Sequence, residues 1–115
     1  MRTPAISVLL IWLILTSFAL GAEPMSSREA FARHLLISHP APQPPLQLRL
    51  RKQHFQGDGM FELAFDFESG RVRDVRVLQS TGNSLLDRNT VITLKGWHAQ
   101  PRTIHLMRLP ITFIL

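Results

Sequence analysis

An alternating strand, a glycine turn and a second strand constrain the fold of this chain more than any other feature. Residues 60 to 67 place four large apolar side chains on one face of a strand, namely Phe61, Leu63, Phe65 and Phe67. Glu68-Ser69-Gly70 is a short loop whose glycine can take a positive φ, so residues 71 to 79 are predicted to return antiparallel. The valines of this return strand do not keep one phase, which predicts a bulge near Arg73-Asp74.

Two further elements are predicted downstream of this hairpin. Asn83 or Ser84 can cap a helix over residues 84 to 97, and we expect this helix to cover the phenylalanine face. Its buried stripe follows helical spacing and consists of Leu86, Thr90, Leu94 and Trp97. The last segment, residues 104 to 115, is rich in β-formers. Pro110 within it has no N–H to donate, so that position is predicted to face an edge or a bulge.

The segments upstream of the hairpin are less regular. Ser26-Ser27-Arg28-Glu29 looks like a capping box, and apolar residues four apart predict a helix over residues 27 to 38. Four prolines between residues 40 and 45 end this helix and predict a stiff polyproline II spacer. Residues 46 to 56 are ambiguous, because alternating leucines favour a strand whereas the composition favours a helix. Gly57-Asp58-Gly59 is predicted to form a turn.

These elements together predict an α+β fold, in which a small antiparallel β-sheet of about three strands packs against one or two helices. A chain of 115 residues is too short for a Rossmann enzyme or an α/β barrel. The absence of cysteine excludes a disulfide scaffold and a cysteine-ligated zinc module. An apolar content of 45% argues against global disorder.

The N-terminus has the layout of an export segment. Arg2 precedes an apolar run over residues 5 to 15, and small residues follow it, so a signal peptide cleaved after Gly21 or Ala22 is one interpretation. Residues 4 to 22 are also just long enough for a retained membrane anchor, at about 20 residues per span. Both interpretations place the rest of the chain outside the cytoplasm, either soluble or anchored.

Over residues 57 to 115, an ordered series of short motifs resembles the C-terminal domain of the TonB family. In chain order these motifs are Gly59, Gly70, Val72-Arg73-Asp74-Val75-Arg76-Val77, Ser80-Thr81-Gly82, Leu86-Asp87, Trp97, Pro101 and Leu109-Pro110-Ile111-Thr112-Phe113. The resemblance rests on their order and spacing. The chain is then divided into a signal or anchor (1–22), an exported helix (23–39), a Pro-rich spacer with the ambiguous segment (40–56) and a TonB C-terminal-like domain (57–115).

The resemblance implies a periplasmic recognition domain involved in transmembrane transport. In the family, an extended segment of an outer-membrane receptor joins an exposed edge of the small sheet, where backbone N–H and C=O groups are unsatisfied. The family's receptor-contacting strand corresponds to residues 109 to 115, and the predicted partner-binding residues are Leu109, Ile111, Thr112, Phe113 and Ile114. The implied partners are an outer-membrane transporter or receptor segment and an inner-membrane proton-channel complex. An exposed edge of this kind also invites a homodimer.

Two departures from the family pattern leave a second function open. The family's anchor usually carries a serine and a histidine one helical turn apart, whereas here Ser7 is followed by Ile11. The family's long Pro-rich arm is reduced to residues 40 to 45. The alternative is a free periplasmic module of the same fold that makes structural or regulatory contacts without energy transduction.

No residue pattern predicts an enzyme, a metal site or a cofactor. His34 and His39 have half of a zinc-site spacing but no second pair of ligands. His98 and His105 flank Pro101 with no serine or acid at triad spacing. The net charge of +5 would attract nucleic acid, but an exported protein rarely meets it, so no nucleic-acid partner is expected.

Overall fold

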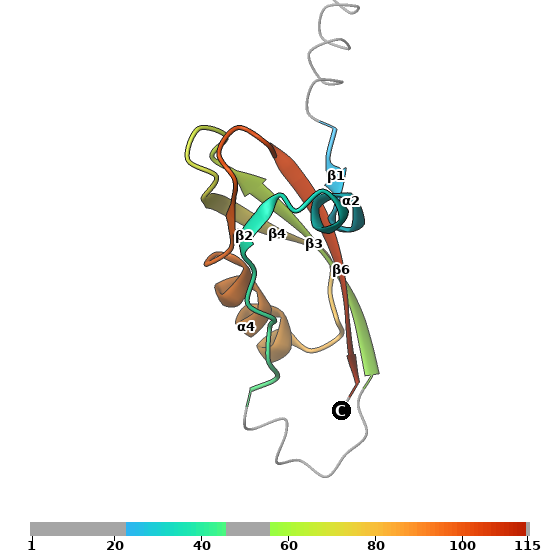
Figure 1. Cartoon of the computed structure of the whole chain (residues 1–115). Coiled ribbons are helices and arrows are strands. Elements are labelled where there is room, and N and C mark those ends of the chain that lie inside the picture. The colour runs from blue at the N-terminus through green and yellow to red at the C-terminus, as the bar shows by residue number, and fades with distance from the viewer. Residues whose placement is uncertain (1–22, 46–55, 115) are drawn as a thin grey trace, which may run out of the picture.

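The computed structural model describes residues 23–45 and 56–114 (Figure 1). The predicted signal or anchor and nearly all of the ambiguous segment lie outside the described residues. The elements in chain order are β1 (Met25–Ser26), α2 (Ser27–Ala32), β2 (Leu36–Ser38), β3 (Gln56–Phe65), β4 (Val72–Gln79), α4 (Ser84–Leu94), β5 (His98–Ala99) and β6 (Leu106–Ile114). In this described part of the chain, neither helix has the length and apolar content needed to cross a membrane.

Four strands form the main sheet, in the order β1-β6-β3-β4. β3 is antiparallel to both β4 and β6, while β1 pairs parallel to β6 at Met25↔Met107 and Ser26↔Arg108. β2 and β5 form a separate antiparallel pair. The predicted α+β class is confirmed, and β4, β3 and β6 are the expected antiparallel strands. The short parallel strand β1 and the β2–β5 pair were not predicted.

The predicted hairpin is present, with its glycine turn and its bulge. Gly70 has a φ of 80°, and the Asp66 N–H donates to the Arg71 carbonyl at 2.8 Å to close the turn. The register shifts where Ala64 pairs with Asp74 but Phe65 pairs with Val72. Arg73 is therefore the extra residue of a bulge, as the valine phase predicts.

The predicted turn at Gly57-Asp58-Gly59 is wrong, because these residues belong to β3. Gly57 pairs with Phe113 and Gly59 with Ile111, so β6 supplies the ladder that keeps them extended. The Thr112 hydroxyl also donates to Asp58 Oδ1 across the pair at 2.8 Å. Turn-forming residues therefore form a strand here because a distant segment pairs with them.

The predicted helix over residues 27 to 38 is also wrong beyond Ala32. Ser26 Oγ accepts from the Glu29 N–H at 3.2 Å and starts α2 as expected. His34, with a φ of 54°, ends the helix in a Schellman motif. In this motif the His34 N–H donates to the Phe31 carbonyl and the Leu35 N–H donates to the Ala30 carbonyl. The next residues then pair with β5 as β2, so tertiary pairing replaces the last turns of the predicted helix.

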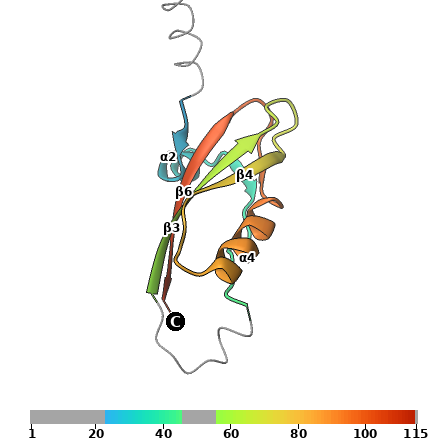
Figure 2. The same cartoon turned by 180° about the vertical axis from the view of Figure 1, so that it is seen from behind.

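Helix α4 covers the apolar face of the sheet beside β4 (Figures 1 and 2). Asn83 Oδ1 accepts from the Leu86 N–H at 3.0 Å and caps it. The helix ends at Leu94 rather than at residue 97, because the N–H groups of Gly96 and Trp97 each donate to a carbonyl three residues back. Trp97 is nevertheless 4% exposed and belongs to the core.

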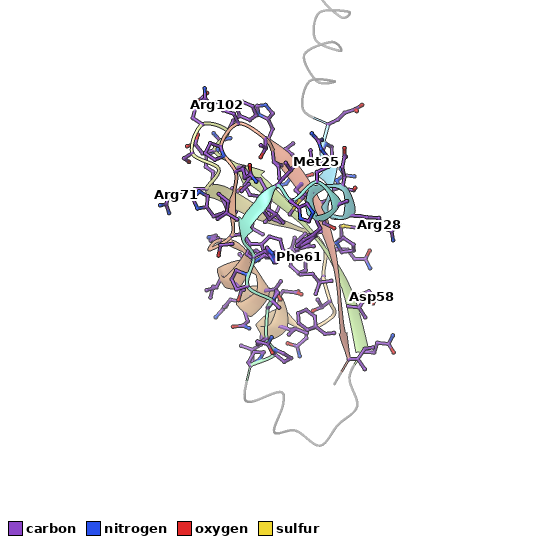
Figure 3. The ribbon with its side chains drawn as sticks, in the orientation of Figure 1. Met25, Arg28, Asp58, Phe61, Arg71 and Arg102 are labelled. Carbon is purple, nitrogen blue, oxygen red and sulfur yellow. The ribbon has the colours of Figure 1, made fainter. Side chains whose placement is uncertain are left out.

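The main hydrophobic core lies between α4 and the sheet, with Phe61 at its centre (Figure 3). Its largest buried members come from β3, β6, α4 and the loops beside them, and include Phe61, Leu63, Phe65, Leu94, Trp97, Ile104, Met107 and Leu109. Phe61, Leu63 and Phe65 of the predicted face are therefore in the core together with the helix, as expected. Phe67 is not, because β3 ends at Phe65 and the half-buried Phe67 ring stacks on His105 instead. A smaller cluster joins Leu86 to Phe113 near the end of β6.

Candidate functional site

Along residues 109–114, the last strand has one side that no strand of the described residues pairs with. β6 pairs with β3 along Leu106–Ile114, but β1 covers its other side only at Met107 and Arg108. We call residues 109–114 the open edge. Figure 1 shows β1 and α2 beside the first part of β6 only.

Backbone alternation decides which groups of the open edge face outward. The Phe65 N–H donates to the His105 carbonyl at 2.9 Å, and the β3–β6 register continues from there without a shift. In an antiparallel ladder, the N–H and C=O of every second residue point to the same neighbour. The groups of residues 107, 109, 111 and 113 therefore face β3, and those of residues 110, 112 and 114 face away from it. Pro110, opposite Met60, lacks an N–H on the outward side, so its predicted position at an edge is confirmed.

The five predicted partner-binding residues fall into two groups. Leu109 and Phe113 are buried and Ile111 is partly buried, so these side chains contribute to the core. Thr112 is exposed, and Ile114 is 75% exposed. Thr112 and Ile114 therefore present both side chain and outward backbone to a partner, while the other three hold the edge in place.

The opposite edge of the sheet, formed by β4, is less regular. Its pairing with β3 shifts register twice, at Arg73 and again at Leu78. It also carries exposed arginines, including Arg73 and Arg76. Bulges and charged side chains are two features that blunt an edge against strand addition. The open edge of β6 has neither a register shift nor a charged residue between 109 and 114.

An ion-pair cluster crosses the face of the sheet away from the core. The Glu62 carboxylate accepts from Arg76 at 3.0 Å and from Arg108 at 3.3 Å, and thereby joins β4, β3 and β6. The Glu62 side chain is only 9% exposed, whereas both arginine side chains are more than half exposed. An ion pair whose arginine is this exposed stabilises a fold by only about 0–1 kcal/mol. The contact with Glu62 does, however, hold the Arg108 side chain in one orientation.

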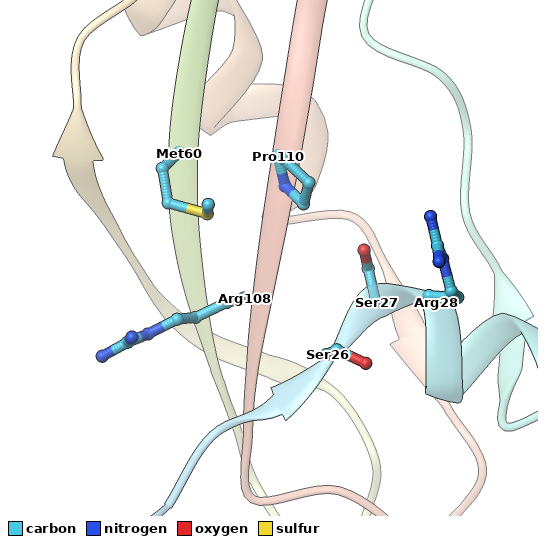
Figure 4. Close-up of a pocket in the computed structure, with 6 residues that line it drawn as sticks. All are labelled: Ser26, Ser27, Arg28, Met60, Arg108 and Pro110. Atoms are coloured by element: carbon cyan, nitrogen blue, oxygen red, sulfur yellow. The ribbon is translucent and has the colours of Figure 1, made fainter.

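A hollow of about 420 Å³ lies where β1 ends and the open edge begins (Figure 4). It is lined by Ser26, Ser27, Arg28, Met60, Arg108 and Pro110. Met60 and Pro110 supply an apolar surface, the two serines supply hydroxyls and the two arginines supply positive charge. Sequence reasoning did not find this hollow, because its walls come from segments more than 30 residues apart.

The histidines singled out in the sequence make separate structural contacts. The His98 Nε2 lies 3.0 Å from the Ser69 carbonyl, and His105 stacks on Phe67 with ring centroids 4.0 Å apart. The His39 ring meets Phe31 edge-on at 5.0 Å. These three rings therefore have separate neighbours, while His34 contributes its backbone carbonyl, which accepts from the Gln100 amide at 2.8 Å. The described residues bring no three metal-ligating side chains together.

The turn Ser80-Thr81-Gly82 is fixed to α4 by Asp87. Its carboxylate accepts hydrogen bonds from the Ser80 hydroxyl and from the N–H and hydroxyl of Thr81. Burial raises the pKa of Asp87, but these hydrogen bonds lower it by more, so the net pKa lies below the usual value. Asp87 is therefore a structural anchor at the start of the helix.

Comparisons with known proteins give a structural likeness but no match in sequence. No protein-family model and no curated protein matches the sequence. The solution NMR structure of the Pseudomonas aeruginosa TonB CTD is similar, with a TM-score of 0.49 and 20% sequence identity. The alignment covers 69% of this chain and 81% of that one. These values assign no family to the chain.

Proposed function

We propose that this chain is a TonB-like protein-recognition domain that binds an extended segment of an outer-membrane receptor by strand addition at the open edge of β6. The observation that carries this proposal is the one-sided pairing of residues 109–114, with a regular register to β3 and no described partner on the other side. The ordered motif series over residues 57 to 115 supports the receptor as the partner.

Strand addition suits this edge for a physical reason. The N–H groups of Thr112 and Ile114 face outward, and so do the carbonyls of residues 110, 112 and 114. These groups need hydrogen-bond partners. An extended chain of almost any sequence can supply them, and neighbouring pockets then select the side chains. Binding of this kind needs neither a cofactor nor a catalytic residue.

We further propose that the domain works in the periplasm as part of transmembrane transport. If residues 4 to 22 are retained as an anchor, an inner-membrane proton-channel complex is a second partner. Membrane fractionation with N-terminal sequencing tests this. A chain that keeps its first residues in the membrane supports the transport role, and a soluble chain starting near Glu23 contradicts direct force transfer.

One observation favours the alternative of a free periplasmic module. The Pro-rich stretch is held against the domain, because the Trp97 Nε1–H donates to the Pro40 carbonyl at 2.9 Å and the Asn89 amide donates to the Gln43 carbonyl. A stretch packed in this way adds little reach across the periplasm. The fractionation experiment separates this module from the transport role.

Titration with extended receptor peptides tests the binding proposal itself. The wild-type chain should show saturable binding, and Thr112→Pro should weaken it about tenfold or more, because proline removes one outward donor and puts a ring on the edge. Thr112→Val keeps the N–H and loses only the Asp58 hydrogen bond, so it should bind like the wild type. Equal binding by all three chains would contradict strand addition at this edge.

The same edge is the predicted site of homodimer formation. Sedimentation at several concentrations should show dimers that the receptor peptide dissociates, since both compete for the same outward groups. A monomer at every concentration would reject the dimer and leave the peptide titration to decide the main proposal.

A further inference from the structure

We infer that the hollow beside β1 is a carboxylate-selective pocket for the partner, holding an acidic side chain at the end of the segment that adds to β6. This inference rests on the proposed function, because it concerns the chain that strand addition brings to this edge. The ligand is an extended peptide with a glutamate or aspartate at one terminus of its pairing stretch.

The position of β1 fixes where the added strand must end. β1 takes the outward side of β6 at Met107 and Arg108, so a chain paired along residues 110–114 runs up against Ser26 and Ser27. The hollow lies at that junction, with Pro110 on one side and the two serines on the other (Figure 4). The terminal side chain of the added strand therefore enters it. A volume of about 420 Å³ accommodates a glutamate side chain together with some water.

The lining of the hollow favours a negative charge. Two arginines line it and no acidic residue does. Arg28 joins no ion pair among the described residues, and Figure 3 shows it at the outer side of the domain near β6. Arg108 reaches toward β3, where its Nε donates to Glu62, so Arg28 is the arginine on the side of the added strand (Figure 4). The methylenes of a glutamate would meanwhile lie against Met60 and Pro110.

The same geometry relates the position of the acid to the direction of the added strand. The Arg108 end of the open edge is its N-terminal end. A strand parallel to β6 therefore presents its own N-terminal residue to the hollow, and an antiparallel strand presents its C-terminal residue. A pair of peptides with the acid at opposite ends consequently reports the direction of addition as well as the presence of the pocket.

The test uses the full chain in detergent and three fluorescent peptides that share one alternating apolar sequence. One peptide carries glutamate at its N-terminal end, one at its C-terminal end, and the third carries glutamine at both. One glutamate peptide should bind the wild type about two- to fivefold more tightly than the glutamine peptide, since partly exposed charge pairs give modest gains. The difference should shrink in high salt.

Two charge reversals locate the effect. Arg28→Glu should abolish the preference for the glutamate peptide and favour a peptide with lysine at the same end. Arg73→Glu makes the same change of net charge on β4, outside the hollow, and should leave the preference intact. An equal loss in both variants, or equal affinities of the wild type for all three peptides, would overturn the pocket while strand addition stands. Failure of every peptide to bind would overturn the proposed function and the pocket together.

Discussion

Substitution of Gly70 by alanine should destabilise the domain far more than an ordinary turn glycine would predict. Gly70 has a φ of 80°, a region that costs an L-residue about 1–2 kcal/mol. An added Cβ would also lie 2.0 Å from the Ala99 carbonyl oxygen, whereas ordinary van der Waals contact begins at 3.4 Å, so the backbone there must move by 3.4 − 2.0 = 1.4 Å.

That movement has a calculable cost, because Ala99 is fully buried and fixed on two sides. Its N–H donates to the Gly70 carbonyl at 2.7 Å, and it pairs with Leu36 of β2. Loss of one or two such hydrogen bonds costs about 1–2 kcal/mol in addition to the backbone term. We therefore expect Gly70→Ala to lower the free energy of unfolding by about 3 kcal/mol.

Gly82→Ala provides the matched control. Gly82 has a similar positive φ of 94°, but no atom lies within 4 Å of the position of its added Cβ. It should therefore show the backbone term alone, about 1–2 kcal/mol. Urea unfolding followed by fluorescence of the buried Trp97, in a Trp12→Phe background, measures both variants. If Gly70→Ala costs no more than Gly82→Ala, the contact between the hairpin turn and β5 is refuted.

Two further stability predictions use the same assay. Asp87→Asn should cost about 1 kcal/mol at neutral pH through weakened hydrogen bonds. Because the pKa of Asp87 is lowered in the folded chain, its stabilising effect is complete above the unfolded pKa of about 3.9 and is lost as the pH falls through the folded pKa. The difference in the free energy of unfolding between wild type and Asp87→Asn should thus disappear in acid. A difference that stays constant with pH would contradict the role of the charge. Leu94→Ala should lower the free energy of unfolding by about 2–5 kcal/mol, because Leu94 is fully buried. Ile92→Ala should change it by less than about 1 kcal/mol, because Ile92 is 64% exposed. Equal losses of stability in the two variants would contradict the orientation of α4.

The parts of the fold predicted correctly are those set by neighbours in the sequence. The hairpin follows from side-chain alternation and a glycine at its turn, and the bulge at Arg73 follows from a break in that alternation. The start of α4 follows from one capping side chain, Asn83. In each case the deciding contacts span only a few residues, so a local pattern contains the information.

The wrong predictions concern segments whose state depends on distant partners. Gly57-Asp58-Gly59 has turn chemistry, but pairing with residues 111 to 113 makes it strand. The helix from Ser27 ends early because His34 adopts a left-handed conformation that glycine usually takes, and the following residues pair with β5. Neither partner is visible in a local window, and propensities of under about 1 kcal/mol per residue are easily outweighed.

The sequence by itself determined the α+β class, the hairpin and the capped helix, and its family resemblance predicted the last strand as a recognition element. Tertiary structure alone decided which groups of that strand face outward, because this depends on the register with β3 over a separation of about 50 residues. It also decided that β1 closes one end of the edge and that Ser26, Arg28 and Arg108 line one hollow. The partner strand is distant in the sequence, and a shift of the pairing by one residue would turn every side chain of β6 to the other face of the sheet. The burial of Leu109 and Phe113 in the folded core therefore fixes this register.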